Sequence, residues 1–190
     1  MLHRIFIAIN LPESLKNELL SYRETWPSLP VRWTKSENLH ITLVFLGNVS
    51  DQELEELKMK TREVAKKHRP FQLSFTKIVY GPTKKNPKMI WAIGEESKEL
   101  FMLQRDLSKS SLRDSVPKLG TESLESPNFT VHITLARIKA FEFSRINGEE
   151  RPQINEEISL KIPVNSIEIM ESKLKRTGPE YTICESILLA

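Results

Sequence analysis

The tetrapeptide His-Ile-Thr-Leu occurs twice in this chain, and the repeat restricts the folds that the sequence can adopt. The copies begin 92 residues apart, at positions 40 and 132, which is about half of the 190-residue chain. Both lie in apolar runs typical of β-strands, in a sequence with only four histidines. An internal duplication would place one copy in each half of the molecule, with a cleft between the halves.

The other strand and helix signals predict an α+β fold. Many predicted strands are close neighbours in sequence, which favours antiparallel pairing over a doubly wound sheet. Besides the second copy, strands are expected at residues 4–9, 31–33, 39–46, 71–80, 88–94, 157–162, 166–171 and 180–189. Helices are expected from about residue 12, from 51 to about 68 after a Ser50 capping box, and from about 97 to 113, before a loop over 114–128.

Each copy of the repeat would display an imidazole and a hydroxyl side by side on one face of its strand. Successive side chains of a strand point to opposite faces. Strict alternation therefore places Val44 with the polar residues of the first copy and Phe45 on the opposite, apolar face. The polar residues of the two copies are His40, Thr42, His132 and Thr134.

Two opposed histidine–threonine pairs suit acid–base chemistry on a phosphoryl group. An unperturbed imidazole titrates near pH 6.5, so that it can accept or donate a proton near neutral pH. The threonine hydroxyls can donate hydrogen bonds to phosphate oxygens as charge builds on them. A structural role and a two-histidine metal site are the alternatives, although no carboxylate or cysteine stands at a supporting spacing.

Composition and the absence of other motifs exclude several classes. A single cysteine excludes an intramolecular disulfide and a cysteine-rich zinc site. The chain has neither a Gly-x-Ser-x-Gly motif nor a phosphate-binding Gly-x-x-x-x-Gly-Lys loop, so serine catalysis and ATP use are not indicated, and no cofactor is expected. The apolar run at the N-terminus is too short to span a membrane, and we expect a soluble, cytoplasmic monomer. The net charge of +3 is compatible with phosphate or nucleic-acid ligands.

The sequence resembles the two-histidine (2H) phosphoesterases, and within them the RNA 2′,3′-cyclic phosphodiesterases, also called 2′-5′ RNA ligases. The similar segments are "RIFIAINLPESLKNEL", "VRWTKSENLHITLVFLGNVS", "FTVHITLAR" and "MESKLKRTGPEYT", which extend over nearly the whole chain. Val131 stands where the family usually has proline before the second histidine.

The resemblance implies a single bilobal domain over residues 1–190. Two antiparallel sheets related by a pseudo-two-fold would line a central cleft, with helices outside. It also implies metal-independent opening of RNA 2′,3′-cyclic phosphate ends to 2′-phosphomonoesters, with possible reversal as 2′-5′ ligation. His132 would then be the base that activates water and His40 the acid, while Thr42 and Thr134 would hold the phosphate oxygens.

Other residues near the motifs are candidates for binding the substrate. Arg137 completes the second motif, but strict alternation turns it away from His132 unless the strand ends or bulges near Ala136. Arg32 could contact the RNA backbone, and Trp33 could stack on a base or pack in the core. Tyr181 could border the site from the C-terminal hairpin, although a role in the turn before the last strand is favoured.

Two other functions remain open from the sequence. One is the same chemistry on small cyclic nucleotides or 2′-5′ oligonucleotides. The other is RNA binding without turnover, which would not require two proton donors and acceptors.

Overall fold

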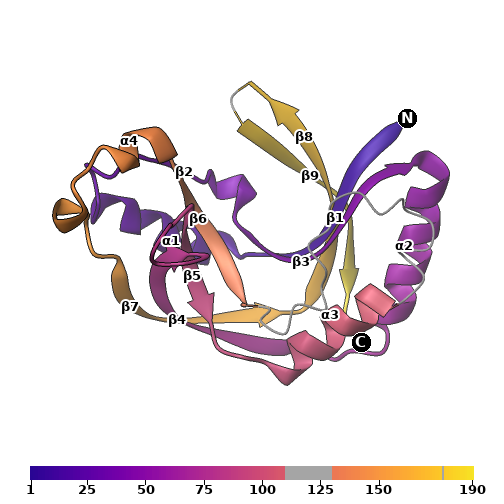
Figure 1. The fold of residues 1–190 in the computed structure, drawn as a ribbon. Coiled ribbons are helices and arrows are strands. Elements are labelled where there is room, and N and C mark those ends of the chain that lie inside the picture. Colours follow the sequence, from indigo (N-terminus) through magenta and orange to yellow (C-terminus); the bar gives the residue numbers. More distant parts are fainter. Residues whose placement is uncertain (110–129, 177) are drawn as a thin grey trace.

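The computed structural model describes residues 1–109, 130–176 and 178–190, which form two antiparallel sheets with helices outside them (Figure 1). Sheet A contains four strands in the order β3-β1-β8-β9. Sheet B contains five, in the order β2-β6-β5-β4-β7. The predicted α+β class with two antiparallel sheets is therefore confirmed.

The strands agree with the sequence pattern to within a few residues at their ends. They are β1 (Leu2–Asn10), β2 (Val31–Trp33), β3 (His40–Ser50), β4 (Phe71–Gly81), β5 (Met89–Gly94), β6 (His132–Ile138), β7 (Asn155–Val164), β8 (Ser166–Lys175) and β9 (Gly178–Leu188). The helices are α1 (Glu13–Ser21), α2 (Asp51–Ala65), α3 (Lys98–Lys109) and α4 (Ala140–Ser144), with single 3₁₀ turns η1 (Tyr22–Glu24), η2 (Ser36–Asn38) and η3 (Gly148–Glu150).

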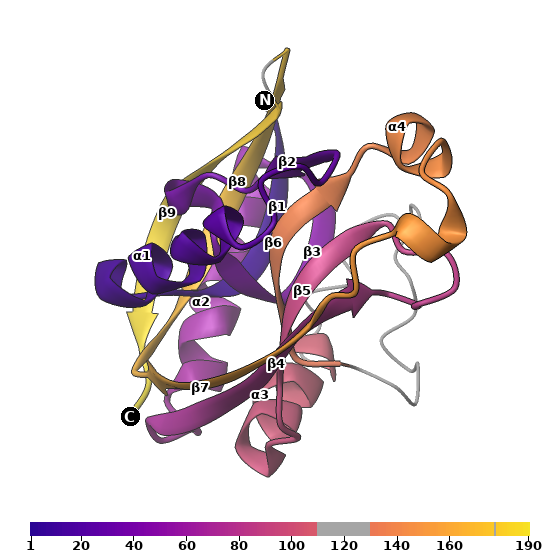
Figure 2. The same cartoon turned by 90° about the vertical axis from the view of Figure 1, so that its left-hand side faces the viewer.

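The two copies of the repeat occupy equivalent positions in the two sheets. His40 is the first residue of β3, and His132 is the first residue of β6. In sheet A, β3 is followed by β1, β8 and β9, and in sheet B, β6 is followed in the same way by β5, β4 and β7. Strand β2 is added on the outer side of β6. The strands β3 and β6 contact each other where the two sheets meet (Figures 1 and 2).

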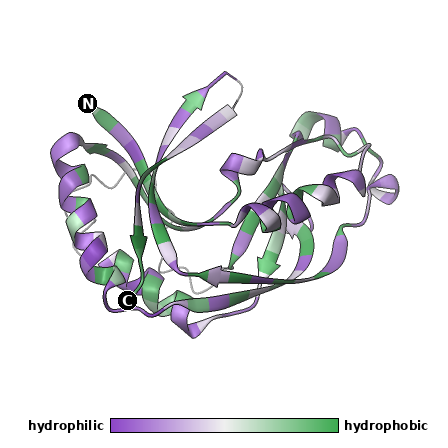
Figure 3. Cartoon of the chain, turned by 180° about the vertical axis from the view of Figure 1, so that it is seen from behind, coloured by the Kyte–Doolittle hydropathy of each residue, from purple (hydrophilic) through white to green (hydrophobic). Residues whose placement is uncertain are grey.

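One continuous apolar core joins the two sheets and anchors the strands that carry the repeat. The central strand β1 is buried from Ile5 to Ile9, as its unbroken apolar sequence predicted. Helices α2 and α3 cover the outer face of sheet A and turn their polar residues outward (Figure 3). Their core residues are Leu54, Leu57, Val64, Leu100, Leu103 and Leu107. The predicted capping box at the start of α2 is confirmed, because the Ser50 hydroxyl accepts from the Glu53 N–H while the Glu53 carboxylate accepts from the Ser50 N–H.

The helices differ from the sequence expectations at α4 and at the end of α3. The polar stretch after β6 contains the short helix α4, which the sequence did not indicate because its one buried side chain is Phe143. Helix α3 is described as far as Lys109, so its predicted extension to residue 113 and the predicted loop over 114–128 lie outside the described residues. In the described part of the chain, no helix has the length and hydropathy needed to cross a membrane.

Candidate active site

The two histidines of the repeat are held by the same backbone contact. The Nδ1 atom of His40 lies 2.8 Å from the carbonyl oxygen of Asn38, and the Nδ1 atom of His132 lies 2.8 Å from the carbonyl oxygen of Thr130. A carbonyl only accepts hydrogen bonds, so Nδ1 carries the proton in both rings. Nε2 is therefore the unprotonated nitrogen of each neutral imidazole, and in His40 it accepts from the Thr42 hydroxyl.

Aromatic residues of sheet A surround the His40 ring. The ring centroid of Phe6 lies 5.1 Å from that of His40, and Tyr181 approaches edge-on at 5.2 Å. On the remaining side, Nε2 of His40 lies 2.9 Å from the Thr42 hydroxyl, as expected for neighbours two residues apart on one face. The imidazole is therefore positioned by packing as well as by hydrogen bonds.

Tyr181 lies beside the first histidine, as the less favoured of its two expected roles had it. Its place in β9 brings it across sheet A to the His40 ring, where it also contacts Phe6. No sequence signal indicated this contact, because β9 and β3 are the two edge strands of sheet A and far apart in the chain.

In the second lobe, His132 rests on an aromatic platform formed by Trp91. The two rings are stacked, with centroids 4.0 Å apart and an angle of 23° between their planes. The indole in turn lies flat against Gly81 of β4. A Cβ atom at position 81 would be 2.8 Å from Cε2 of the indole and closer still to two other ring atoms. Gly81 therefore leaves the space in which Trp91 supports the histidine.

Both strands bulge directly after the repeat. The register of β3 against β1 shifts between Thr42 and Val44, and the register of β6 against β5 shifts between Thr134 and Ala136. A bulge adds one residue to one strand, so the residues beyond it exchange faces. The fifth residue after each histidine consequently joins the face that carries the histidine.

The bulge in β3 reverses the predicted positions of Val44 and Phe45. Val44 is buried in the core, whereas Phe45 is 57% exposed and its ring lies 5.9 Å from that of Phe6. Phe45 is therefore a candidate site residue that strict alternation missed. The bulge that exposes it arises from the pairing of β3 with β1, and no sequence signal indicated it.

The bulge in β6 brings Arg137 to the face of the histidine. Strict alternation would have turned Arg137 away, and a bulge near Ala136 is what allows it to share this face. Nη1 of Arg137 and the hydroxyl of Thr134 both lie 3.9 Å from the Met89 sulfur, so the two side chains share one face. Arg32 is directly opposite Arg137 in the pairing of β2 with β6 and is exposed on the same face.

Trp33 lies on the other side of sheet B. It pairs with the buried Ala136 and packs against the hydrophobic core. A β-strand alternates its side chains, so the face that presents Arg32 to the cleft turns Trp33 inward. The structure thus favours the core role for Trp33, and we do not retain it as a substrate-binding residue.

Burial favours the neutral form of both imidazoles. The pKa of His40 is lowered to about 4, chiefly by desolvation; the hydrogen bond to Asn38 opposes the shift, and electrostatic interactions with His132 and Arg137 add to it. Desolvation also lowers the pKa of His132 below its usual 6.5, against the effect of its bond to Thr130.

The remaining histidines form ion pairs outside this site. His3 lies 2.9 Å from the carboxylates of both Asp51 and Glu171, and His68 lies 3.1 Å from that of Asp106. Within residues 1–109, 130–176 and 178–190, no three His, Cys, Asp or Glu side chains are grouped as metal ligands.

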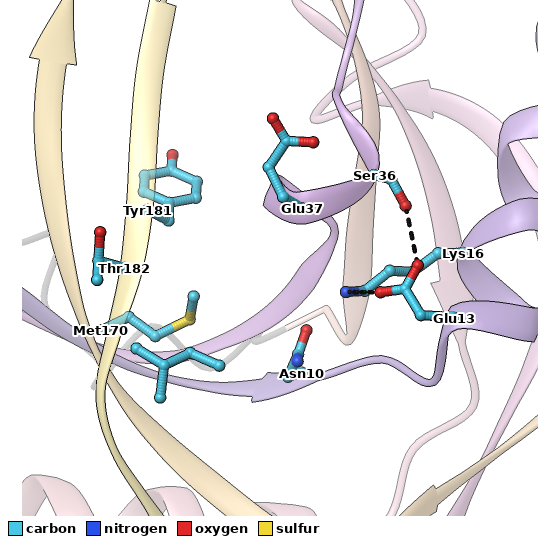
Figure 4. Close-up of a pocket in the computed structure, with 9 residues that line it drawn as sticks. Asn10, Glu13, Lys16, Ser36, Glu37, Met170, Tyr181 and Thr182 are labelled. Atoms are coloured by element: carbon cyan, nitrogen blue, oxygen red, sulfur yellow. Dashed lines mark hydrogen bonds and ion pairs between the residues drawn. The ribbon is translucent and has the colours of Figure 1, made fainter.

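A pocket of about 530 Å³ lies between strands β8 and β9 of sheet A on one side and α1 and η2 on the other (Figure 4). Tyr181 forms part of its wall and also contacts His40. Across the pocket, the Glu13 carboxylate accepts from Nζ of Lys16 at 2.8 Å. The pocket lining consists of Asn10, Glu13, Lys16, Ser36, Glu37, Met170, Tyr181, Thr182 and Ile183.

Comparison with known proteins agrees with this arrangement. Residues 9–91 match the model of the LigT-like phosphoesterases, a segment that contains the first His-Ile-Thr-Leu copy. The RNA 2′,3′-cyclic phosphodiesterase of Aquifex aeolicus is 28% identical over 83% of this chain and 81% of its own length. The enzyme of the same name from Methanothermobacter thermautotrophicus is 27% identical over 96% of each chain.

A solved structure shows the same fold over the whole chain. The crystal structure of a protein from Thermus thermophilus, which is 26% identical, superposes with a TM-score of 0.78 over 98% of this chain and 97% of the other. The similarity extends through both sheets and therefore includes the strands of both histidine–threonine pairs. The family model over the first half, the relatives that span both sheets and the shared fold therefore make this chain similar to the LigT-like phosphoesterases.

Proposed function

We propose that this protein hydrolyses the terminal 2′,3′-cyclic phosphate of RNA to a 2′-phosphomonoester. The observation that supports this most strongly is the matched pair of histidines on β3 and β6, each held through Nδ1 with Nε2 unprotonated. The name of the relatives in Aquifex and Methanothermobacter supports the same substrate.

The proposed reaction is an acid–base displacement at phosphorus. Nε2 of one histidine takes a proton from water as the water oxygen attacks the phosphorus atom. The bond between phosphorus and O3′ breaks, and the other histidine, protonated at Nε2, donates its proton to O3′. Thr42 and Thr134 donate hydrogen bonds to the non-bridging oxygens, on which negative charge increases in the transition state. The family resemblance implies that His132 is the base and His40 the acid, and this assignment stays a prediction.

Turnover of a defined RNA tests the function directly. A short RNA that ends in a 2′,3′-cyclic phosphate, incubated with the protein and EDTA, is expected to yield a 2′-phosphate end, because the proposed groups are all side chains of this protein. Separation of the 2′- and 3′-phosphate isomers by chromatography identifies the product. RNA binding without product would support the non-catalytic alternative, and full inhibition by EDTA would support a metal-dependent reaction.

Anion binding is expected to raise the pKa of His40. In the empty site its pKa is about 4 because burial disfavours the charged ring, so the imidazole is neutral at pH 7. A phosphate dianion beside the ring stabilises the imidazolium and shifts the pKa upward. Proton NMR of the ring resonances, with and without adenosine 2′-phosphate, measures both values. Calorimetry at pH 7, where the ligand phosphate is mainly the dianion, should show net proton uptake on binding, and proton release or no linkage at that pH would contradict the proposed site.

Phe45 is expected to stack on the base of the terminal nucleotide. Its exposed ring shares the cleft face with His40 and Thr42, and stacking of one base on an aromatic ring contributes roughly 1–3 kcal/mol. We expect Phe45→Ala to raise KM for the cyclic-phosphate RNA by about tenfold and to change kcat much less. Phe101 of α3 is a matched control, because it is 59% exposed on the outer surface, and Phe101→Ala should leave KM unchanged. Equal KM values for Phe45→Ala and the unmodified protein would exclude the stacking role.

A further inference from the structure

Two arginines of sheet B lie side by side on the cleft face, and the described part of the chain gives neither a negatively charged partner. Arg32 of β2 and Arg137 of β6 are directly opposite residues of an antiparallel pair, so that their Cβ atoms are roughly 5 Å apart. Like charges in this position repel each other and destabilise the pair. A glutamate at either position would replace this repulsion by an attraction.

No carboxylate within residues 1–109, 130–176 and 178–190 forms an ion pair with either guanidinium. Among the same residues, the polar partner of Arg137 is the Met89 sulfur, which is a weak acceptor. The neighbouring carboxylates are engaged elsewhere, each with a lysine: Glu37 with Lys35, Glu142 with Lys139 and Glu180 with Lys175. The two guanidiniums thus provide positive charge at the cleft that these carboxylates do not neutralise.

The hairpin between β8 and β9 borders the same place from the other sheet. A Cβ atom on Gly178 would be 3.7 Å from Nη1 of Arg32 and 3.8 Å from its Cζ. Nearby, Nδ2 of Asn38 donates to the Pro179 carbonyl oxygen at 2.9 Å, which ties the hairpin to the loop before β3. Gly178 also has a φ of +119°, a conformation that favours glycine. The guanidinium of Arg32 therefore lies beside the first residue of β9.

The position of the two arginines relative to the histidines indicates which anion they bind. Thr134 and Arg137 are three residues apart along β6, or roughly 7–10 Å at the usual rise of a strand. The scissile phosphate, bound between His40 and His132, can therefore be followed by a second phosphate at the arginines. Planar guanidiniums suit this task because each can bind two phosphate oxygens at once.

We propose that Arg32 and Arg137 form a second phosphate subsite, which binds the phosphate on the 5′ side of the terminal nucleotide. This inference rests on the proposed function and specifies its substrate as the end of an RNA chain rather than a free nucleoside cyclic phosphate. A nucleoside 2′,3′-cyclic phosphate fills only the site between the histidines. An RNA end fills both, so the arginines select RNA ends over small cyclic nucleotides.

Three substrates separate the phosphate contribution from that of the rest of the chain. They are adenosine 2′,3′-cyclic phosphate, its 5′-phosphorylated form, and the dinucleotide ApA with a terminal cyclic phosphate. We expect kcat/KM for the second and third to exceed that for the first by about tenfold or more, since each adds a charge-assisted contact. A gain for the dinucleotide alone would mean that the preceding nucleoside is bound instead of the phosphate, and would overturn the proposal.

Substitution of Arg32 tests which residue provides the preference. In Arg32→Ala, we expect the ratio of kcat/KM for the 5′-phosphorylated substrate to that for the unphosphorylated one to fall by about tenfold or more. Arg32→Lys should give an intermediate ratio, because an ammonium keeps the charge but loses the planar fork. The matched control is Arg69→Ala, since Arg69 is exposed between α2 and β4 near the C-terminus and should leave the ratio unchanged. An equal loss for both substrates would show that Arg32 acts only through the fold or at the scissile phosphate.

A binding measurement keeps this test independent of turnover. Adenosine 2′,5′-bisphosphate is expected to bind about tenfold more tightly than adenosine 2′-phosphate by calorimetry, and Arg32→Ala should remove the difference. If no cyclic phosphate is hydrolysed but the difference and its loss are observed, the proposed function fails and the subsite remains. If hydrolysis occurs but the two nucleotides bind equally, the subsite fails and the proposed function remains.

Discussion

Replacement of either His40 or His132 by alanine is expected to lower kcat for a cyclic-phosphate RNA by about 10²–10⁴-fold. Each variant removes one of the two Nε2 atoms that the proposed reaction uses for proton transfer. The fold should persist, because both histidines are only half-buried and the side chains on the opposite face of each strand, such as Ile41 and Ile133, complete the core. Single-turnover kinetics measures the effect, and circular dichroism with a thermal melt verifies folding.

A substrate with a good leaving group distinguishes the acid from the base. Nitrophenolate leaves phosphorus without needing a proton, so a nitrophenyl phosphodiester substrate should recover most of the activity of the variant that lacks the acid. Recovery is expected for His40→Ala and not for His132→Ala. The opposite result would exchange the two roles, and recovery in neither variant would contradict a two-histidine acid–base reaction.

The control for both variants is a histidine outside the cleft. His3 forms ion pairs with Asp51 and Glu171 at the start of β1, and His3→Ala should leave kcat unchanged. A comparable loss of kcat in all three variants would show that the effect of the cleft histidines is not specific to catalysis.

Gly81→Ala is expected to lower kcat by about 10²-fold, although position 81 is not itself a proposed catalytic position. The new methyl group would overlap the Trp91 indole, whose ring supports the His132 imidazole at a centroid distance of 4.0 Å. Displacement of a catalytic group by about 1 Å can cost about 10²-fold in rate. Overpacking of this kind also reduces the free energy of unfolding by typically about 1–3 kcal/mol. Kinetics and urea unfolding of the same preparation give both quantities.

The chain offers a matched control in Gly148. Nothing lies within 4 Å of a Cβ atom added there, so Gly148→Ala should leave both kcat and the urea midpoint unchanged. If Gly81→Ala also keeps the kcat of the unmodified protein, Trp91 does not position His132 for the reaction.

Local sequence was sufficient to predict the strands, the α+β class and the side-by-side placement of each histidine with its threonine. Alternation within four residues places each histidine and its threonine on one face, and no distant contact is needed for that arrangement. The unbroken apolar run of β1 and the capping box of α2 were equally readable, because each depends on neighbours in sequence. The flanking segments also carried enough of the family pattern to indicate the relatives that comparison later found.

The tertiary structure alone decided which other side chains join the site. The bulges after Thr42 and Thr134 arise from the register of β3 against β1 and of β6 against β5, which the sequence of one strand does not specify. One inserted residue exchanges the faces of all residues beyond it, and this turns Phe45 and Arg137 toward the histidines. Tyr181 contacts His40 although their strands, β9 and β3, are the two edge strands of sheet A. The chain thus encodes the reacting pairs locally, whereas the groups around them depend on strand pairing between distant segments.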